Sequence, residues 1–270
     1  MKVGFIGGGN MAEAMIGGML KQGFASADIQ VTEPNAERRV YLADQFGTPV
    51  EAAAVATLAV DVLVLAVKPQ ILREVLTGLP KLAPDTCVLS IAAGARAGDI
   101  ARWLAGHAAV VRAMPNTPAL VGAGIAGLYA LAGVSAVQRQ RVEQVLQAVG
   151  QVVWVEDEAQ IDAVTAISGS GPAYVFLFVE AMEAAARELG LAADTARVLA
   201  LQTVHGAAVL AVRDGSEPAL LRARVTSKGG TTERGIAELE AHGVRAAVSA
   251  AAHAAAARAK ELGDLLGAER

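Results

Sequence analysis

The chain has 270 residues, of which 54% are hydrophobic, a net charge of −4 and a pI near 5.6. This composition is sufficient for one large or two smaller globular domains, and the charge, without any basic cluster, argues against a nucleic-acid partner. A single cysteine, Cys87, excludes an internal disulfide and indicates a reducing compartment. We expect a cytoplasmic protein, because the first residues lead directly into a strand and lack the apolar stretch of a signal peptide. We expect no membrane segment, because prolines and glycines interrupt the uncharged stretch 113–138.

The first half of the chain alternates short β-branched runs with alanine-rich helical stretches. This alternation predicts an α/β domain over residues 1–158, with helices wound onto both faces of a parallel sheet in the doubly wound, Rossmann-like manner. The expected strands are 2–6, 29–32, 62–67, 87–92, 110–113, 125–129 and 152–155. Ligands of such sheets lie outside the carboxyl ends of the strands, so we expect Gly7, Glu33, Lys68, Ala93 and Met114 to line one crevice.

Residues 7–12 read G-G-G-N-M-A, which fits the dinucleotide-binding pattern G-x-G-x-x-A between a strand and a helix. Gly7 allows the tight turn, Gly9 lets a pyrophosphate approach the backbone, and Ala12 lets helix and strand pack closely. Glu33 ends the second expected strand, where an acidic residue binds the ribose of the cofactor. The sequence therefore predicts a nicotinamide dinucleotide, NADPH or NADH.

The choice between the two nicotinamide cofactors stays open from the sequence. Glu33 favours a free ribose 2′-hydroxyl and repels a 2′-phosphate, whereas Arg38 and Arg39 are close enough to attract that phosphate. The arginines could equally form a solvated first helical turn.

From about residue 159 the strand signals stop and helical patterns follow. The expected helices are 173–189, 195–213, 218–224, 232–240 and 244–266. Between Arg197 and Arg213 the single ionisable side chain is His205, so this helix is apolar on nearly every face and needs cover on all sides. We therefore predict that residues 159–270 form an all-α dimerisation and substrate-binding domain, covered by a second copy in a homodimer.

The segment V-T-S-K-G-G-T-T at residues 225–232 lies between two of these helices. Gly229 and Gly230 allow a tight turn, and the unpaired amides that open the next helix attract an anion such as a small carboxylate. Ser227 and the threonines could instead only cap a surface helix.

Six motifs together resemble the pyrroline-5-carboxylate reductase family, and the resemblance covers nearly the whole chain in the right order. They are G-F-I-G-G-G-N-M-A, A-V-K-P, S-I-A-A-G, R-A-M-P-N-T-P-A-L-V-G, S-G-S-G-P-A-Y and V-T-S-K-G-G-T-T. The resemblance implies reduction of 1-pyrroline-5-carboxylate to L-proline by a domain-swapped dimer, often assembled into a decamer.

The resemblance also assigns site residues. It places the substrate carboxylate on amides near Gly230, Thr231 and Thr232, with Glu158 as a further substrate contact. It implies that the Thr232 hydroxyl faces the ring nitrogen with Ser227 nearby, which makes these two the candidate catalytic residues. The expected cofactor contacts are Ile6, Gly7, Gly8, Gly9, Asn10, Met11, Glu33, Ala66, Val67, Lys68, Pro69, Ile91, Ala92, Ala93 and Asn116.

Two departures from the family pattern stand out: Glu33, where many relatives carry a small polar residue, and the pair Glu233-Arg234, which we expect to alter only the helix surface. Alternative readings are a β-hydroxyacid dehydrogenase, another imine reductase, or a non-enzymic dinucleotide sensor. A hydroxyacid enzyme of this type carries a lysine on its helical domain, and residues 173–213 contain none. No metal site is expected, because the four histidines lack ligand spacing.

Overall fold

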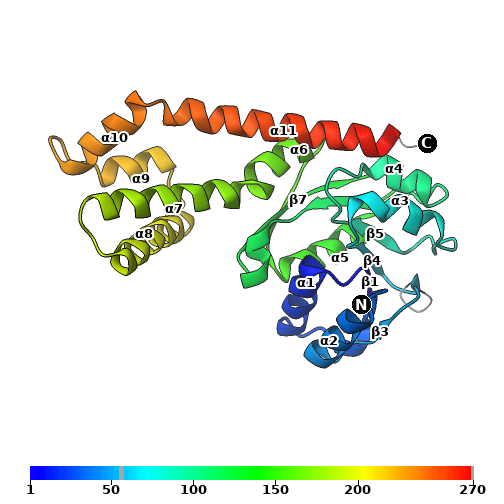
Figure 1. Cartoon of the computed structure of the whole chain (residues 1–270). Coiled ribbons are helices and arrows are strands. Elements are labelled where there is room, and N and C mark those ends of the chain that lie inside the picture. Colours follow the sequence, from blue (N-terminus) through cyan, green and yellow to red (C-terminus); the bar gives the residue numbers. More distant parts are fainter. Residues whose placement is uncertain (55–57, 269–270) are drawn as a thin grey trace. The chain divides into compact units, whose positions relative to one another are not determined.

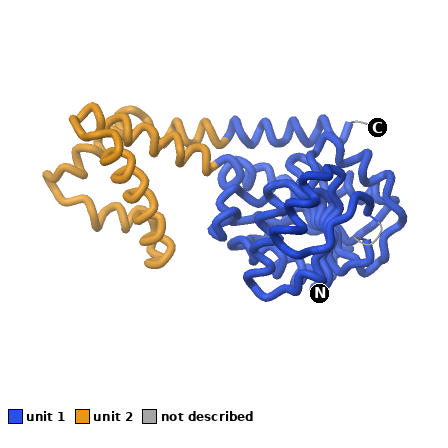
Figure 2. Tube along the Cα trace, turned by 60° about the horizontal axis from the view of Figure 1, so that its bottom comes forward, with its two compact units in different colours: residues 1–170, 253–270 blue, residues 171–252 orange. Residues whose placement is uncertain are grey.

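The computed structural model describes residues 1–54 and 58–268. These residues form two compact units (Figure 2): residues 1–170 with 253–268 make unit 1, and residues 171–252 make unit 2. The division between residues 158 and 159 stays a prediction about domains. The compact units divide instead after Ser170 and again after Ala252, within the last helix.

Unit 1 contains a sheet in which eight strands of the described residues follow the order β3-β2-β1-β4-β5-β6-β7-β8. The strands are β1 (Val3–Ile6), β2 (Ile29–Thr32), β3 (Val50–Glu51), β4 (Val62–Leu65), β5 (Cys87–Ser90), β6 (Val110–Met114), β7 (Gly124–Ala130) and β8 (Gly150–Trp154). All seven expected strands are present. Sequence reasoning missed β3, because two residues are too short for an apolar pattern.

One strand pair departs from the parallel alignment. Strand β7 runs antiparallel to β6, with Arg112 opposite Tyr129, whereas every other neighbouring pair is parallel. The link between β6 and β7 is a short 3-10 segment, η3 (Thr117–Val121), and a parallel crossover needs about a dozen residues or more.

Helices cover both faces of the sheet (Figure 1). Those of unit 1 are α1 (Asn10–Lys21), α2 (Ala36–Phe46), α3 (Pro69–Thr77), α4 (Ala97–Trp103), α5 (Ala136–Gln147), α6 (Gln160–Val164), the π-helix η4 (Thr165–Gly169) and the end of α11 (Val244–Ala268); a 3-10 turn, η1 (Ser26–Asp28), precedes β2. Alternate residues of each strand point to opposite faces and so build two buried clusters.

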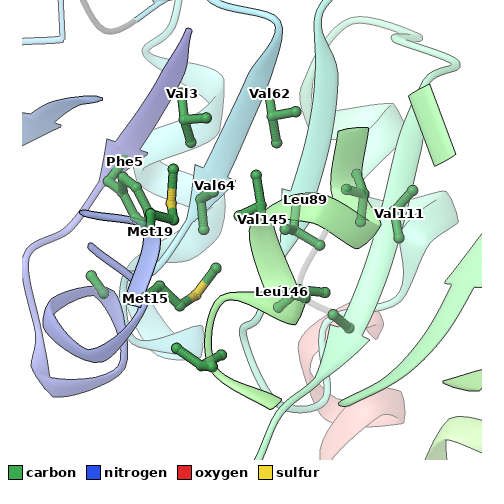
Figure 3. Packing of buried hydrophobic residues seen from close by; sticks show 14 of the residues in the cluster. Val3, Phe5, Met15, Met19, Val62, Val64, Leu89, Val111, Val145 and Leu146 are labelled. Atoms are coloured by element: carbon green, nitrogen blue, oxygen red, sulfur yellow. The ribbon is translucent and has the colours of Figure 1, made fainter. Parts of the chain in front are cut away.

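The first cluster packs Met15 and Met19 of α1 and Leu146 of α5 against Phe5 and other strand residues (Figure 3). The second packs α3 and α4 on the other face. Cys87 is fully buried, and burial raises the pKa of its thiol to about 12, so the thiol is unreactive at neutral pH. The expected α/β architecture with helices on both faces is confirmed.

Unit 2 is helical, as expected, and contains α7 (Gly171–Glu188), α8 (Ala193–Asp214), α9 (Pro218–Arg224), α10 (Thr231–Ala241) and the start of α11. Helices α7 and α8 pack on each other, yet Val179, Ala196 and Ala200 are the buried residues among those described in this unit. Leu177 is 67% exposed and Val212 is 84% exposed. Unit 2 therefore leaves many large apolar side chains exposed, as surfaces that bind another molecule do.

Two helical stretches, Gln160–Glu188 and Ala193–Asp214, are long and apolar enough to cross a membrane by length and composition. Helices buried in the interface of a soluble oligomer share these properties. Their apolar side chains need cover in either case, and the sequence expectation was a second copy of the chain.

We predict that Leu177→Glu weakens self-association at least about tenfold, because burying a leucine side chain contributes roughly 2 kcal/mol. Light scattering coupled to size-exclusion chromatography measures the shift toward monomer. Val40→Glu, which places the same charge at an exposed apolar position of α2 in unit 1, serves as the control. A wild-type chain that stays monomeric at micromolar concentration, or one that needs detergent to stay soluble, would contradict the prediction.

Candidate dinucleotide and substrate sites

The carboxyl ends of five neighbouring strands form one edge of the sheet in unit 1. The strand order β2-β1-β4-β5-β6 brings the residues that follow these strands to this edge, as expected. Backbone bonds tie the edge together: the amide of Gly7 donates to the Thr32 carbonyl at 2.8 Å, and that of Ala66 donates to the Ile6 carbonyl at 2.8 Å. The backbone near the glycine turn is therefore fixed by its neighbours.

The glycine turn between β1 and α1 has room for a phosphate. Gly7 has φ +99°, and a β-carbon there would lie 2.7 Å from the Ala66 carbonyl oxygen. A β-carbon on Gly8 would lie 2.5 Å from Leu42, whereas one on Gly9 would meet nothing within 4 Å. Gly9 is also the N-cap of α1 and makes no side-chain cap. The helix thus opens with amides free of a side-chain cap beside an unfilled space, which fits a dinucleotide pyrophosphate.

Glu33 lies beside this turn with both carboxylate oxygens engaged. Its Oε2 accepts the amide of Gly8 at 2.9 Å, and its Oε1 accepts the amide of Asn35 at 2.9 Å. A fixed carboxylate at the end of the second strand suits a ribose hydroxyl and repels a phosphate.

The two arginines of α2 are not the solvated pair that the sequence left as one alternative. Arg38 donates from Nε to the Gly8 carbonyl at 2.6 Å and pairs through Nη2 with Glu13. Arg39 donates to the carbonyls of Glu33 and Pro34 at 3.0 and 2.7 Å. Sequence reasoning missed Glu13, because its partner Arg38 lies on another helix and no local sequence pattern predicts the pair.

The remaining expected cofactor contacts lie at the same edge or just behind it. Ala66 and Val67 follow β4, the exposed Lys68 is the N-cap of α3, and Pro69 is the first residue of that helix. The segment 91–93 follows β5.

Asn116 lies after β6 and is buried. It donates to the Ser168 carbonyl at 3.1 Å and accepts the Ile125 amide at 3.0 Å, so its side chain already links η4 to the start of β7. Its role toward a cofactor stays a prediction.

The expected substrate loop lies in unit 2 and has the form of an anion cradle. Gly229 has φ +74°, and the amide of Gly230 donates to the Ser227 carbonyl at 3.0 Å. Gly230 is the N-cap of α10 without a side-chain cap, and a β-carbon there would collide with Ser227 Oγ. Because the N-cap is a glycine, the N-cap residue itself supplies no side-chain cap to α10. The Ser227 hydroxyl lies close to the turn.

Glu233 is part of this loop, so the expectation that it alters only the helix surface was wrong. Its carboxylate accepts the amide of Gly229 at 2.6 Å. A glutamate in the first turn of a helix can reach back to an amide before the helix, and this geometry brings it there. The sequence signal was the three-residue spacing from Gly230, the N-cap, to the acid.

Glu158, the other expected substrate contact, belongs to unit 1. It accepts the Ala97 amide at 2.7 Å and pairs with the buried Arg112 at 3.2 Å, and Arg112 lies 3.5 Å from Asp162. The side chains of Glu158, Arg112 and Asp162 line a cavity of about 520 Å³ together with His253 and others. Sequence reasoning missed Arg112, although a lone charge in an apolar strand is a usable signal.

Among the described residues, no three His, Cys, Asp or Glu side chains gather in a way that could hold a metal ion. His107 contacts the Thr86 carbonyl at 2.8 Å, and His242 contacts the Glu238 carbonyl at 2.9 Å. Each of these two rings thus hydrogen-bonds to a backbone carbonyl.

Comparisons with known proteins cover nearly the whole chain. The family model "Pyrroline-5-carboxylate reductase dimerisation" matches residues 158–262, and the model "NADP oxidoreductase coenzyme F420-dependent" matches residues 2–94. A pyrroline-5-carboxylate reductase of Pseudomonas aeruginosa is 49% identical over 98% of both chains.

Two solved structures are similar over 97% of this chain and 98% of theirs. A pyrroline-5-carboxylate reductase from Coxiella burnetii has a TM-score of 0.91 at 40% identity. A pyrroline carboxylate reductase from Plasmodium falciparum with NADP bound has a TM-score of 0.84 at 27% identity.

We predict that Glu33→Ser raises the ratio of kcat/KM for NADPH to that for NADH about tenfold, because it removes a fixed negative charge beside the ribose. Steady-state kinetics with both cofactors measure the ratio. Glu37→Gln, an exposed carboxylate in the first turn of α2, is the control. An unchanged ratio in Glu33→Ser would show that Glu33 does not contact the ribose.

Proposed function

The chain belongs to the pyrroline-5-carboxylate reductase family, and from this premise we propose which residues carry its reaction. The enzyme is an NAD(P)H-dependent oxidoreductase that reduces 1-pyrroline-5-carboxylate to L-proline, the last step of proline biosynthesis. The likeness along 98% of the chain to a curated reductase is the observation that carries this function. The hydroxyacid and sensor alternatives have no comparable support.

The reaction does not require a strong acid group from the protein. A cyclic imine is protonated readily, and its iminium form accepts hydride at carbon without a strong enzymic acid. When bound, the reduced nicotinamide supplies that hydride. The protein's tasks are to hold two reactants together, exclude water and fix the substrate carboxylate.

We assign these tasks to the two turns described above. The glycine turn at residues 7–9 and the amides of Asn10 and Met11 hold the cofactor phosphates, and Glu33 binds the ribose. The uncapped start of α10 supports the assignment of the substrate carboxylate to the amides near Gly230 and Thr231. In this proposal the Thr232 hydroxyl orients the ring nitrogen or relays its proton, with Ser227 beside it.

The chain forms homo-oligomers, since the dimerisation model of its family covers residues 158–262. The exposed apolar surface of α7 and α8 supports a dimer in which a second copy covers these helices. We propose further that dimers assemble into a decamer and that the enzyme works in the cytoplasm, without nucleic-acid or membrane partners.

The function is tested by following oxidation of NADPH and of NADH with pyrroline-5-carboxylate. We expect turnover with this substrate and none with a hydroxyacid when the reverse direction is assayed. Turnover of the hydroxyacid alone would overturn the proposal.

We predict that Thr232→Ala lowers kcat about a hundredfold while cofactor binding is unchanged, because the variant loses the hydroxyl that faces the ring nitrogen. Turnover kinetics and cofactor titration separate the two effects. Thr232→Ser keeps a hydroxyl and is expected to retain most of the activity. Wild-type kinetics in Thr232→Ala would remove this side chain from the mechanism.

The two sets of site residues lie in different compact units, and we propose that each active site combines units from two chains. We expect Gly9→Val to fold, because a β-carbon at this position meets nothing within 4 Å, and its side chain to fill the space proposed for the pyrophosphate. Mixing inactive Gly9→Val and Thr232→Ala chains under subunit exchange is then expected to restore about a quarter of the activity, the statistical share of sites with both intact parts. If each chain works alone, the mixture stays inactive.

A further inference from the structure

Four charged side chains surround the end of β2 and the glycine turn: Glu13, Glu33, Arg38 and Arg39. In the sequence, Glu33 favours a ribose hydroxyl, whereas Arg38 and Arg39 favour a phosphate. In the structure, both arginines are already bonded to other groups of the protein. These bonds determine whether the arginines are available to a phosphate.

Three elements hold Arg38. Its Nε donates to the Gly8 carbonyl in the glycine turn at 2.6 Å, its Nη2 pairs with Glu13 of α1, and its guanidinium lies 4.9 Å from the ring centre of Tyr41 on α2. The side chain is 25% exposed. A guanidinium with a neutralised charge and an occupied edge is a poor receptor for an incoming phosphate.

Glu13 is the residue that fixes Arg38. One of its carboxylate oxygens pairs with Arg38, and the other accepts the Tyr41 hydroxyl at 2.8 Å. Burial acts to raise the pKa of Glu13, but the hydrogen bonds from Arg38 and Tyr41 and the charge of Arg38 outweigh burial and leave it below its usual value. Glu13 also lies in the first turn of α1, where a helix N-terminus favours negative charge. It is therefore ionised at neutral pH.

The second arginine is engaged as well. Arg39 donates through Nη1 to the carbonyls of Glu33 and Pro34, which directs that nitrogen to the backbone. The carboxylate of Glu33 meanwhile stays fixed by the amides of Gly8 and Asn35. The two acids and two arginines sum to no net charge at a position where a 2′-phosphate would add about two negative charges.

We propose that Glu13 is a specificity-determining residue of the cofactor site. By holding Arg38 against the glycine turn, it keeps the guanidinium from a ribose 2′-phosphate, and together with Glu33 it adapts the site to the dinucleotide that lacks this phosphate. Glu13 acts through Arg38 and does not itself contact the cofactor. The inference rests on the cofactor site proposed above and adds the residue that sets its selectivity between NADH and NADPH.

The competing arrangement is one in which Arg38 swings out to grip the phosphate. That movement breaks its bonds to Gly8 and Glu13 and its stacking on Tyr41 together. It also leaves the Glu13 carboxylate without its cation near the added phosphate charge, which disfavours the phosphorylated cofactor.

The test compares binding of adenosine 2′,5′-bisphosphate with binding of AMP by isothermal titration calorimetry, alongside kcat/KM for NADPH and NADH. Glu13→Gln frees the charge of Arg38, so we expect the affinity ratio of the bisphosphate to AMP to rise about fivefold, the upper range for a partly exposed ion pair. Glu37→Gln removes an exposed carboxylate from the first turn of α2 and is expected to leave the affinity ratio unchanged.

Arg38→Gln completes the cycle. In the wild-type background it is expected to leave the ratio unchanged, and in the Glu13→Gln background it is expected to abolish the gain. An unchanged ratio in a folded Glu13→Gln protein, an equal gain in Glu37→Gln, or a drop in the ratio in Arg38→Gln alone would overturn the proposal. If neither nucleotide binds the wild-type protein, the cofactor site itself is misplaced, which separates the two failures.

Discussion

The close approach of Gly7 to the carbonyl of Ala66 is the constraint on which the dinucleotide edge depends. A β-carbon at Gly7 would lie 2.7 Å from that oxygen, and the positive φ of Gly7 turns the chain from β1 directly into α1. Any side chain there would push β1 away from β4 and break the backbone bond between Ile6 and Ala66. The glycine turn follows from this contact, and the amide of Gly7, which donates to the Thr32 carbonyl at 2.8 Å, ties the turn to the end of β2 beside Glu33.

The second constraint is the lack of cover on unit 2. Helices α7 and α8 bury few side chains between them, so their apolar surface must be removed from water by another molecule. The same property makes these helices pass a length-and-composition test for membrane spans. The family model for dimerisation, which matches residues 158–262, supports a second copy of the chain as that other molecule.

Much of the fold was predictable because most strands and helices, unlike the two-residue β3, are long enough to show their own period. The helix 218–224 was predicted at the residues where α9 forms, and the glycine turn was predicted from spacing alone. The antiparallel pair β6 and β7 was not, because strand direction depends on the length and path of a link that carries no periodic signal. The pairing of Glu13 with Arg38 was equally hidden, since the partners are distant in sequence and meet only after α1 and α2 pack.

The two expected anion sites share a hydrogen bond that the glycine motifs do not predict. In each, a carboxylate accepts an amide of the glycine turn: Glu33 accepts Gly8, and Glu233 accepts Gly229. Each acid satisfies an amide of the turn and also places a negative charge near a helix N-terminus. The first effect orders the turn and the second weakens its attraction for anions. The glycines give each turn its shape, and the nearby carboxylate reduces its attraction for an anion. The affinity of either turn for an anion therefore depends on the helix amides that remain uncapped.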